Sequence, residues 1–249
     1  MNDLFLIFAG LVAGTIDSIA GGGGLITLPS LSTILEPGPH AIGTNKIVGT
    51  AGALMAFLVY LRKQPLHIKK GLSFIVAVGV GSVLGSLCSP LVPRIYFRYF
   101  LIAACPLILF VLWNKQGFMK EARDHARATW GALVTTGVAV GFYDGFFGPG
   151  GGTFMLIGLM AGARMALFEA LLLSKLANTL SAAVSLTSYG IQGFVHTRYG
   201  LIMAIGMTAG SFMGARLASK KAEQVVRPVL VFVVLLLMAV QIRDVFGTS

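Results

Sequence analysis

Long apolar runs separated by short polar clusters divide the chain into segments of membrane-spanning length. Crossing about 30 Å of hydrocarbon takes about 20 helical residues. Three runs in each half meet that length, at 43–61, 71–91 and 95–113, and again at 171–190, 200–218 and 228–245. Ahead of each set lie a shorter apolar stretch (4–20 and 129–147), a glycine-rich break, and an apolar piece too short to cross alone (25–35 and 153–161). We interpret each break with its flanks as a re-entrant or broken-helix hairpin.

This order of elements occurs twice because the sequence itself repeats. Residues 10–24 read GLVAGTIDSIAGGGG and residues 137–151 read GVAVGFYDGFFGPGG, so Asp17 aligns with Asp144. After a slip of two residues, Lys46 aligns with Lys175. The repeat therefore predicts two halves, residues 1–113 and 128–249, joined by a charged cytoplasmic linker at 114–127.

An odd number of crossings in each half predicts that the second half is inverted relative to the first. The basic residues support this, because cytoplasmic loops carry an excess of lysine and arginine. With the loop at 62–70 placed inside, thirteen loop lysines and arginines lie inside and four lie outside. We expect an all-α polytopic membrane protein of two inverted-topology repeats, with both termini outside the cytoplasm. Secondary transporters with this architecture bind substrate near the midplane, between the repeats.

Composition agrees with lipid as the main solvent. The 249 residues are 56% hydrophobic and 11% charged, whereas soluble domains are about 45–50% apolar and about 25% charged. The net charge of +10 could suggest nucleic acid. The basic residues lie in clusters between apolar runs, however, so no nucleic-acid partner is expected. Cys88 and Cys105 lie in apolar stretches without a CxxC spacing, so we interpret them as core residues and expect no metal site.

The glycine breaks are candidates for binding an anion. Glycine and proline do not sustain a helix, and the helix that starts after each break directs its positive end toward the gap. After inversion two such ends face each other, with Gly23 and Gly24 on one side and Gly150 and Gly151 on the other. The alternative is a tightly packed hinge without a ligand.

Asp17 and Asp144 immediately precede the breaks. Each shares one helical face with glycines spaced three and four residues apart, and such small-residue faces pack helix against helix. Both carboxyls should therefore point into the bundle, where ionisable groups are functional candidates. We interpret them as proton carriers, with a structural role at the break as the alternative.

Lys46 and Lys175 are embedded in otherwise apolar or small-polar helices. A cation beside amide and hydroxyl donors suits an oxyanion, and these donors are Thr44, Asn45, Ser174 and Asn178. Snorkelling to the membrane interface is the alternative for both lysines. Ion pairs Asp17–Lys46 and Asp144–Lys175 within each half would make the charges structural.

Three segments, GFYDGFFGPGGG (141–152), GTNK (43–46) and SKLAN (174–178), resemble the TauE/SafE family of sulfite and organosulfur-anion exporters. The resemblance extends over nearly the whole chain. It implies secondary transport of sulfite, a sulfonate or a related sulfur anion across the bacterial inner membrane, driven by the proton gradient and without a cofactor. The first half carries GGGG where the second carries GPGG, so the two glycine breaks need not bind an anion equally.

The leading hypothesis is thus a proton-coupled anion transporter. A passive anion channel, or a uniporter of other cargo, is the alternative and would show flux without proton coupling. No HExxH or GxSxG motif predicts an enzyme. The small-residue faces could serve internal packing or a homodimer.

Overall fold

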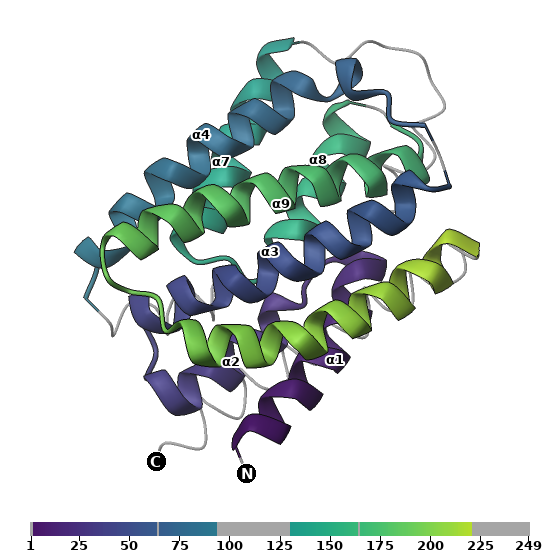
Figure 1. Cartoon of the computed structure of the whole chain (residues 1–249). Helices are drawn as coiled ribbons and strands as arrows, with labels where there is room; N and C mark the ends of the chain where they lie inside the picture. The colour runs from purple at the N-terminus through teal and green to yellow at the C-terminus, as the bar shows by residue number, and fades with distance from the viewer. Residues whose placement is uncertain (1, 64, 94–129, 164, 221–249) are drawn as a thin grey trace, which may run out of the picture.

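A computed structural model describes residues 2–63, 65–93, 130–163 and 165–220 of the chain. All regular elements in these ranges are helical (Figure 1). The first half contains α1 (Asn2–Ala20), α2 (Gly24–Leu35), α3 (Pro39–Leu61) and α4 (Leu72–Cys88), with single 3-10 turns at Ile68–Lys70 and Ser89–Leu91. The second contains α7 (Trp130–Phe146), α8 (Gly151–Gly162), α9 (Leu167–Ile191) and the helix Thr197–Lys220. The predicted spans at 95–113 and 228–245 and the linker at 114–127 lie outside the described residues.

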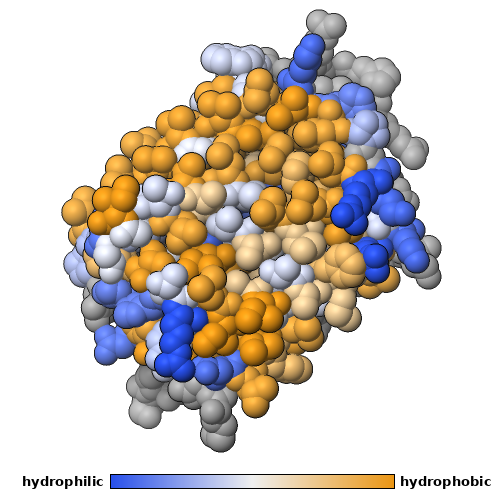
Figure 2. All heavy atoms as spheres, viewed as in Figure 1, coloured by the Kyte–Doolittle hydropathy of each residue, from blue (hydrophilic) through white to orange (hydrophobic). Residues whose placement is uncertain are grey.

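Five of the described helices are long and apolar enough to cross a membrane. They are Asp3–Ala20, Pro39–Leu61, Leu72–Leu91, Leu167–Ile191 and Thr197–Lys220. The face shown in Figure 2 carries a broad apolar band with hydrophilic patches at its two ends. On α4, for instance, Val76 and Val80 are both more than half exposed. A broad apolar surface over helices of spanning length is typical of a membrane protein, so the prediction of an all-helical membrane protein is confirmed.

The two glycine breaks end one helix and begin a short one, as the sequence predicts. Gly21 and Gly22 have φ angles of 80° and 93°, and Gly148 and Gly150 have 101° and 79°. These left-handed conformations suit glycine because it has no Cβ. The helices that follow, α2 and α8, have 12 residues each. At 1.5 Å per residue each is about 18 Å long, too short to span the hydrocarbon.

The glycine-rich faces bring helices from the two halves into backbone contact. On α4, Gly81 and Gly85 lie directly against α7, and a Cβ at Gly85 would overlap the backbone of Phe142. In the same way Gly210, on the helix Thr197–Lys220, lies against the backbone of α1 at Leu11. Close helix packing thus explains these glycines without a ligand. It also places a helix of each half against the first helix of the other.

Helices α3 and α9 lie side by side at the centre of the molecule (Figure 1). Both begin earlier than the sequence analysis predicts, at Pro39 rather than 43 and at Leu167 rather than 171. Lys46 and Lys175 therefore lie about two turns inside their helices, where they are 4% and 1% exposed. The interpretation of these lysines as snorkelling residues is wrong, because their side chains point into the protein.

Candidate functional site

The four buried charges form two ion pairs, and each pair joins the two halves of the chain. Lys46 Nζ lies 3.1 Å from Asp144 Oδ2, and Lys175 Nζ lies 2.8 Å from Asp17 Oδ2. Each ammonium also donates a hydrogen bond to the backbone carbonyl of the same aspartate. Each lysine thus places a positive charge in the last turn of a helix, where the helix dipole favours it.

The structure differs from the ion pairs considered in the sequence analysis. The pairings Asp17–Lys46 and Asp144–Lys175 are wrong, because each aspartate pairs with the other lysine. The reason lies in the two glycine breaks, which touch. Thr153 Oγ1 in the first turn of α8 donates to the carbonyl of Ala20 at the end of α1, at 3.1 Å. This contact brings the end of α1 to the second half, so Asp17 meets the lysine of α9 instead of the lysine of α3.

Two buried tyrosines donate hydrogen bonds to the ends of the interrupted helices α1 and α7. The Tyr60 hydroxyl donates to the carbonyl of Ser18 in α1 at 2.5 Å. The Tyr189 hydroxyl donates to the carbonyl of Gly145 in α7 at 2.9 Å. Both carbonyls belong to the last turn of a helix, where carbonyl groups lack N–H donors from a following turn. The sequence repeat aligns these tyrosines, but it did not suggest their role.

A small cavity lies between the breaks and the two central helices. The centre of a water-sized sphere can reach about 40 Å³ of it, and about 10–15 Å³ of such volume holds one water. It therefore has room for a few waters or a small ion. Its lining consists of Asp17, Gly22, Gly24, Thr27, Asn45, Lys46, Gly49, Asp144, Gly148, Gly150, Gly151, Gly152, Asn178, Ala182 and Met207.

Two amide side chains in this lining make no hydrogen bond to other described residues. Asn45 and Asn178 are 7% and 8% exposed, and neither side chain makes a hydrogen bond within the part of the chain that the structure describes. The Oδ1 atom of Asn45 is fully buried without a partner. Because a buried amide without a partner costs free energy, these groups are suited to a polar ligand or to water in the cavity.

Eight of the predicted site residues line the cavity, and four do not. Those that line it are Asp17, Gly24, Asn45, Lys46, Asp144, Gly150, Gly151 and Asn178. The other four have partners elsewhere. The Gly23 N–H donates to Asp17 Oδ1, the Thr44 hydroxyl accepts from the His196 N–H, the Ser174 hydroxyl donates to the Leu171 carbonyl, and Lys175 is held by Asp17.

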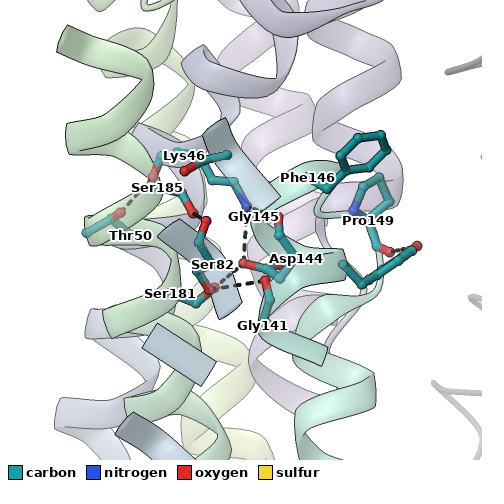
Figure 3. A network of polar contacts seen from close by, with 12 residues as sticks. Lys46, Thr50, Ser82, Gly141, Asp144, Gly145, Phe146, Pro149, Ser181 and Ser185 are labelled. Atoms are coloured by element: carbon teal, nitrogen blue, oxygen red, sulfur yellow. Dashed lines mark hydrogen bonds and ion pairs between the residues drawn. The ribbon is translucent and has the colours of Figure 1, made fainter. Parts of the chain in front are cut away.

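Among the described residues, a serine hydroxyl contacts the carboxylate of one ion pair and not that of the other. Ser181 on α9 donates to Asp144 Oδ2, and its Oγ lies 2.6 Å from the Oγ of Ser82 on α4 (Figure 3). In the register that aligns Lys46 with Lys175, Ser181 aligns with Gly52. Sequence analysis missed Ser181 because it relied on positions that the two halves share, and the halves differ here.

Two histidines of the described ranges lie at the surface and do not line the cavity. His67 and His196 are exposed in the loops after α3 and α9. Across the described ranges, no group of three or more His, Cys, Asp or Glu side chains could hold a metal ion. The site therefore consists of two ion pairs, the Ser181 and Ser82 hydroxyls beside one of them, two amides and glycine backbone.

Buried charges between two interrupted helices, in a bundle with apolar outer faces, are typical of multi-pass membrane transporters. Comparison with known proteins agrees. Residues 6–242 match the family described as sulfite exporter TauE/SafE, and the chain belongs to this family. The resemblance seen in the sequence is thereby confirmed, as is the expectation that the protein is a transporter and not an enzyme.

Several relatives match over nearly their whole length. A protein named "Probable membrane transporter protein ORF9" from Sinorhizobium sp is 34% identical, over 92% of this chain and 88% of its own. "Probable membrane transporter protein YfcA" from Escherichia coli K12 is 33% identical, over 97% and 90% respectively. A "Probable membrane transporter protein" from Haemophilus influenzae is also 33% identical, over 96% and 94%. No solved structure matches the chain.

Proposed function

We propose that this chain moves a small sulfur-containing anion, such as sulfite or a sulfonate, across the bacterial inner membrane together with a proton. The observation that carries the proposal is the cavity beside Lys46, where a neutralised lysine meets two amides that make no hydrogen bond to other described residues. The family description supports the class of cargo. The cavity supports the size, because only a small ion fits it.

The ion pair supplies a reason for proton coupling. Lys46 is the cation in the cavity lining, and Asp144 already neutralises it. An anion that binds Lys46 must compete with this carboxylate. When Asp144 takes a proton, the ammonium loses its counter-ion and can bind the anion through a charge-assisted hydrogen bond. The proton and the anion therefore favour each other's binding, and together they add no net charge to the site.

Other groups complete the proposed binding site. Asn45 and Asn178 would orient the anion with their amides. Gly24, Gly150 and Gly151 lie at the starts of α2 and α8, where backbone N–H groups and the positive ends of the helix dipoles favour an anion. Asp17 and Asp144 are the candidates for carrying the proton.

Alternating access would use the two halves as inverted repeats, with both termini outside the cytoplasm. Matching contacts in the two halves support this proposal. Each aspartate meets the lysine of the other half, and each buried tyrosine holds the end of an interrupted helix. Rocking of one half against the other would expose the central cavity first to one side of the membrane and then to the other.

Flux measurements test the proposal. Purified protein in liposomes should take up radiolabelled sulfite faster when an inward proton gradient is imposed, compared with equal pH on both sides. Lys46→Met should lower this uptake about tenfold or more, because a hydrogen bond to a charged group contributes about 1.5–3 kcal/mol. Protein-free liposomes at the same gradient correct for passive entry of the protonated forms. Thiosulfate and phosphate in parallel assays give the selectivity.

The possible outcomes separate the alternatives. Sulfite flux that ignores the proton gradient would favour a channel or uniporter. If neither sulfite nor thiosulfate crossed under any gradient, the proposed class of cargo would be wrong.

A further inference from the structure

The two aspartates differ in the groups that contact their carboxyl oxygens. Asp144 Oδ2 accepts from the Ser181 hydroxyl as well as from Lys46 (Figure 3). Asp17 accepts from Lys175 at Oδ2 and from the backbone N–H of Gly23 at Oδ1, at 2.8 and 3.1 Å. Where a serine stands beside Asp144, the first half has Gly52.

A hydroxyl and an N–H respond differently when a carboxylate takes a proton. A serine hydroxyl can donate to a carboxylate and, after rotating, accept from a carboxylic acid. Ser181 can make this change because the neighbouring Ser82 hydroxyl can accept the hydrogen bond that Ser181 would then donate. The Ser82 hydroxyl lies 2.7 Å from the Val78 carbonyl and 3.2 Å from the Gly141 carbonyl. Asp144 thus has hydrogen-bond partners in both protonation states.

The groups that contact the Asp17 carboxyl oxygens can hydrogen-bond to them only when the carboxyl is charged. Both of its oxygens face donors, the Lys175 ammonium and the Gly23 N–H, and neither donor can accept a proton. A carboxylic acid at this position would leave its O–H without either of these groups as an acceptor. An unsatisfied buried polar group is costly, so the surroundings of Asp17 favour a permanent charge.

The charged and titratable surroundings of the two aspartates are otherwise matched. Asp144 faces Lys46 from α3, Tyr189 from α9, and Asp17 across the cavity from α1. Asp17 faces Lys175 from α9 and Tyr60 from α3 in the same way. Within the described ranges α4 contributes only the uncharged Ser82 beside Asp144. In the other half Ser211 corresponds to Ser82 and donates to the Gly14 carbonyl. The Ser181 hydroxyl, opposite Gly52, is therefore the chemical difference between the two sites.

We propose that Asp144 is the one proton carrier, that Ser181 is its positioning residue, and that the Asp17–Lys175 pair stays charged throughout transport. The proposal rests on the proton coupling proposed above and assigns it to one half. One proton passes from a hydronium ion in the water of the cavity to Asp144, and the Ser181 hydroxyl turns from donor to acceptor. The Asp144–Lys46 pair then carries one positive charge, which the anion neutralises.

Infrared difference spectroscopy can test this assignment without any substrate. The intact protein in lipid nanodiscs is titrated with acid, and the carboxylic-acid C=O band is recorded for wild type and variants. The seven other Asp and Glu side chains contribute to this band in every variant. We expect Asp144→Asn to lose one component of the band and Asp17→Asn to lose none. If Asp17→Asn does not fold, the variant Asp17→Asn/Lys175→Gln serves instead, because it leaves no unpaired buried charge. An unchanged band in Asp144→Asn, or loss of a component when Asp17 is replaced, would overturn the proposal.

Serine variants test the positioning role. Ser181→Ala should shift both the frequency of the band and the pH at its midpoint, whereas Ser181→Thr, which keeps the hydroxyl, should restore them. Ser185→Ala is the matched control and should leave the band unchanged, because the Ser185 hydroxyl, one turn further along α9, donates to the Ser82 carbonyl and not to Asp144. An unchanged band in Ser181→Ala would remove Ser181 from the mechanism. Because these spectra need no transport, a protein that moves no sulfite would disprove the cargo and still report which aspartate binds the proton.

Discussion

At the scale of single residues, the exchange of partners between the two Asp–Lys pairs determines how substitutions combine. Asp17 and Lys175 are 158 positions apart, and Lys46 and Asp144 are 98 apart. Removing one member of a buried ion pair costs about 3–5 kcal/mol, because the other charge is left uncompensated, whereas removing both members is much less costly. Double substitutions can therefore identify which charges are partners.

We predict that Asp17→Asn lowers the thermal unfolding midpoint in detergent and that adding Lys175→Gln recovers most of the loss. Adding Lys46→Gln to Asp17→Asn should instead lower the midpoint further, because it breaks the second pair as well. Unfolding monitored by size-exclusion chromatography after heating gives the comparison. Rescue by Lys46→Gln in place of Lys175→Gln would contradict the pairing.

The repeat in the sequence was sufficient to find these four charges but not to pair them. Lys46 is the nearer lysine to Asp17 along the chain, and only the contact between the two breaks reveals that Lys175 is nearer in space. Ser181 was missed for a related reason. A comparison of the halves draws attention to shared residues, so a serine opposite a glycine is passed over although it contacts the site.

At the scale of helices, the glycine faces determine how closely neighbours approach. Helix α4 contacts α7 backbone to backbone, and the helix Thr197–Lys220 contacts α1 in the same way. Even one methyl group has no space at these contacts. Other helical glycines, such as Gly131 and Gly190, have nothing within 4 Å of an added Cβ. The two groups provide test and control positions within one protein.

We predict that Gly85→Ala and Gly210→Ala each destabilise the protein by about 1–3 kcal/mol, the usual cost of overpacking. Gly131→Ala and Gly190→Ala should be neutral or stabilising by up to about 1 kcal/mol, because alanine favours a helix over glycine. Thermal unfolding of the four variants measures this. Equal behaviour of both groups would mean that the close contacts do not limit stability.

The pattern of apolar residues was enough to predict that these helices and breaks exist. It was less reliable in predicting the residue at which each helix begins. Pro39 is tolerated at the start of α3 because the first turn needs no N–H at that position. An apolar count that starts at 43 therefore misses the first turn and places Lys46 too close to an end. The buried position of this lysine depends on that extra turn.

At the scale of the whole molecule, the proposed inversion of the halves makes a prediction about the membrane sides of two loops. His67 and His196 are both exposed, in the loops that follow α3 and α9. If the halves are inverted, His67 lies in the cytoplasm and His196 outside. Helices α3 and α9 are each long enough to cross the bilayer.

We predict that a membrane-impermeant maleimide labels His196→Cys in intact spheroplasts and labels His67→Cys only after permeabilisation. Both variants are made in a background in which Cys88 and Cys105 are replaced by serine, and this background alone is the control. Labelling of both loops from the same side would contradict the inverted arrangement.

The pairing between halves also has a consequence for how the chain is made. During synthesis, Asp17 and Lys46 enter the membrane well before Lys175 and Asp144, which lie 158 and 98 residues further along. At about 5–20 residues per second, these charges wait about 5–30 s for their partners. We therefore expect the first half to remain beside the insertion machinery or water until the second arrives. A chain truncated at mid-length would keep two unpaired charges in lipid, and we expect membrane proteases to remove it.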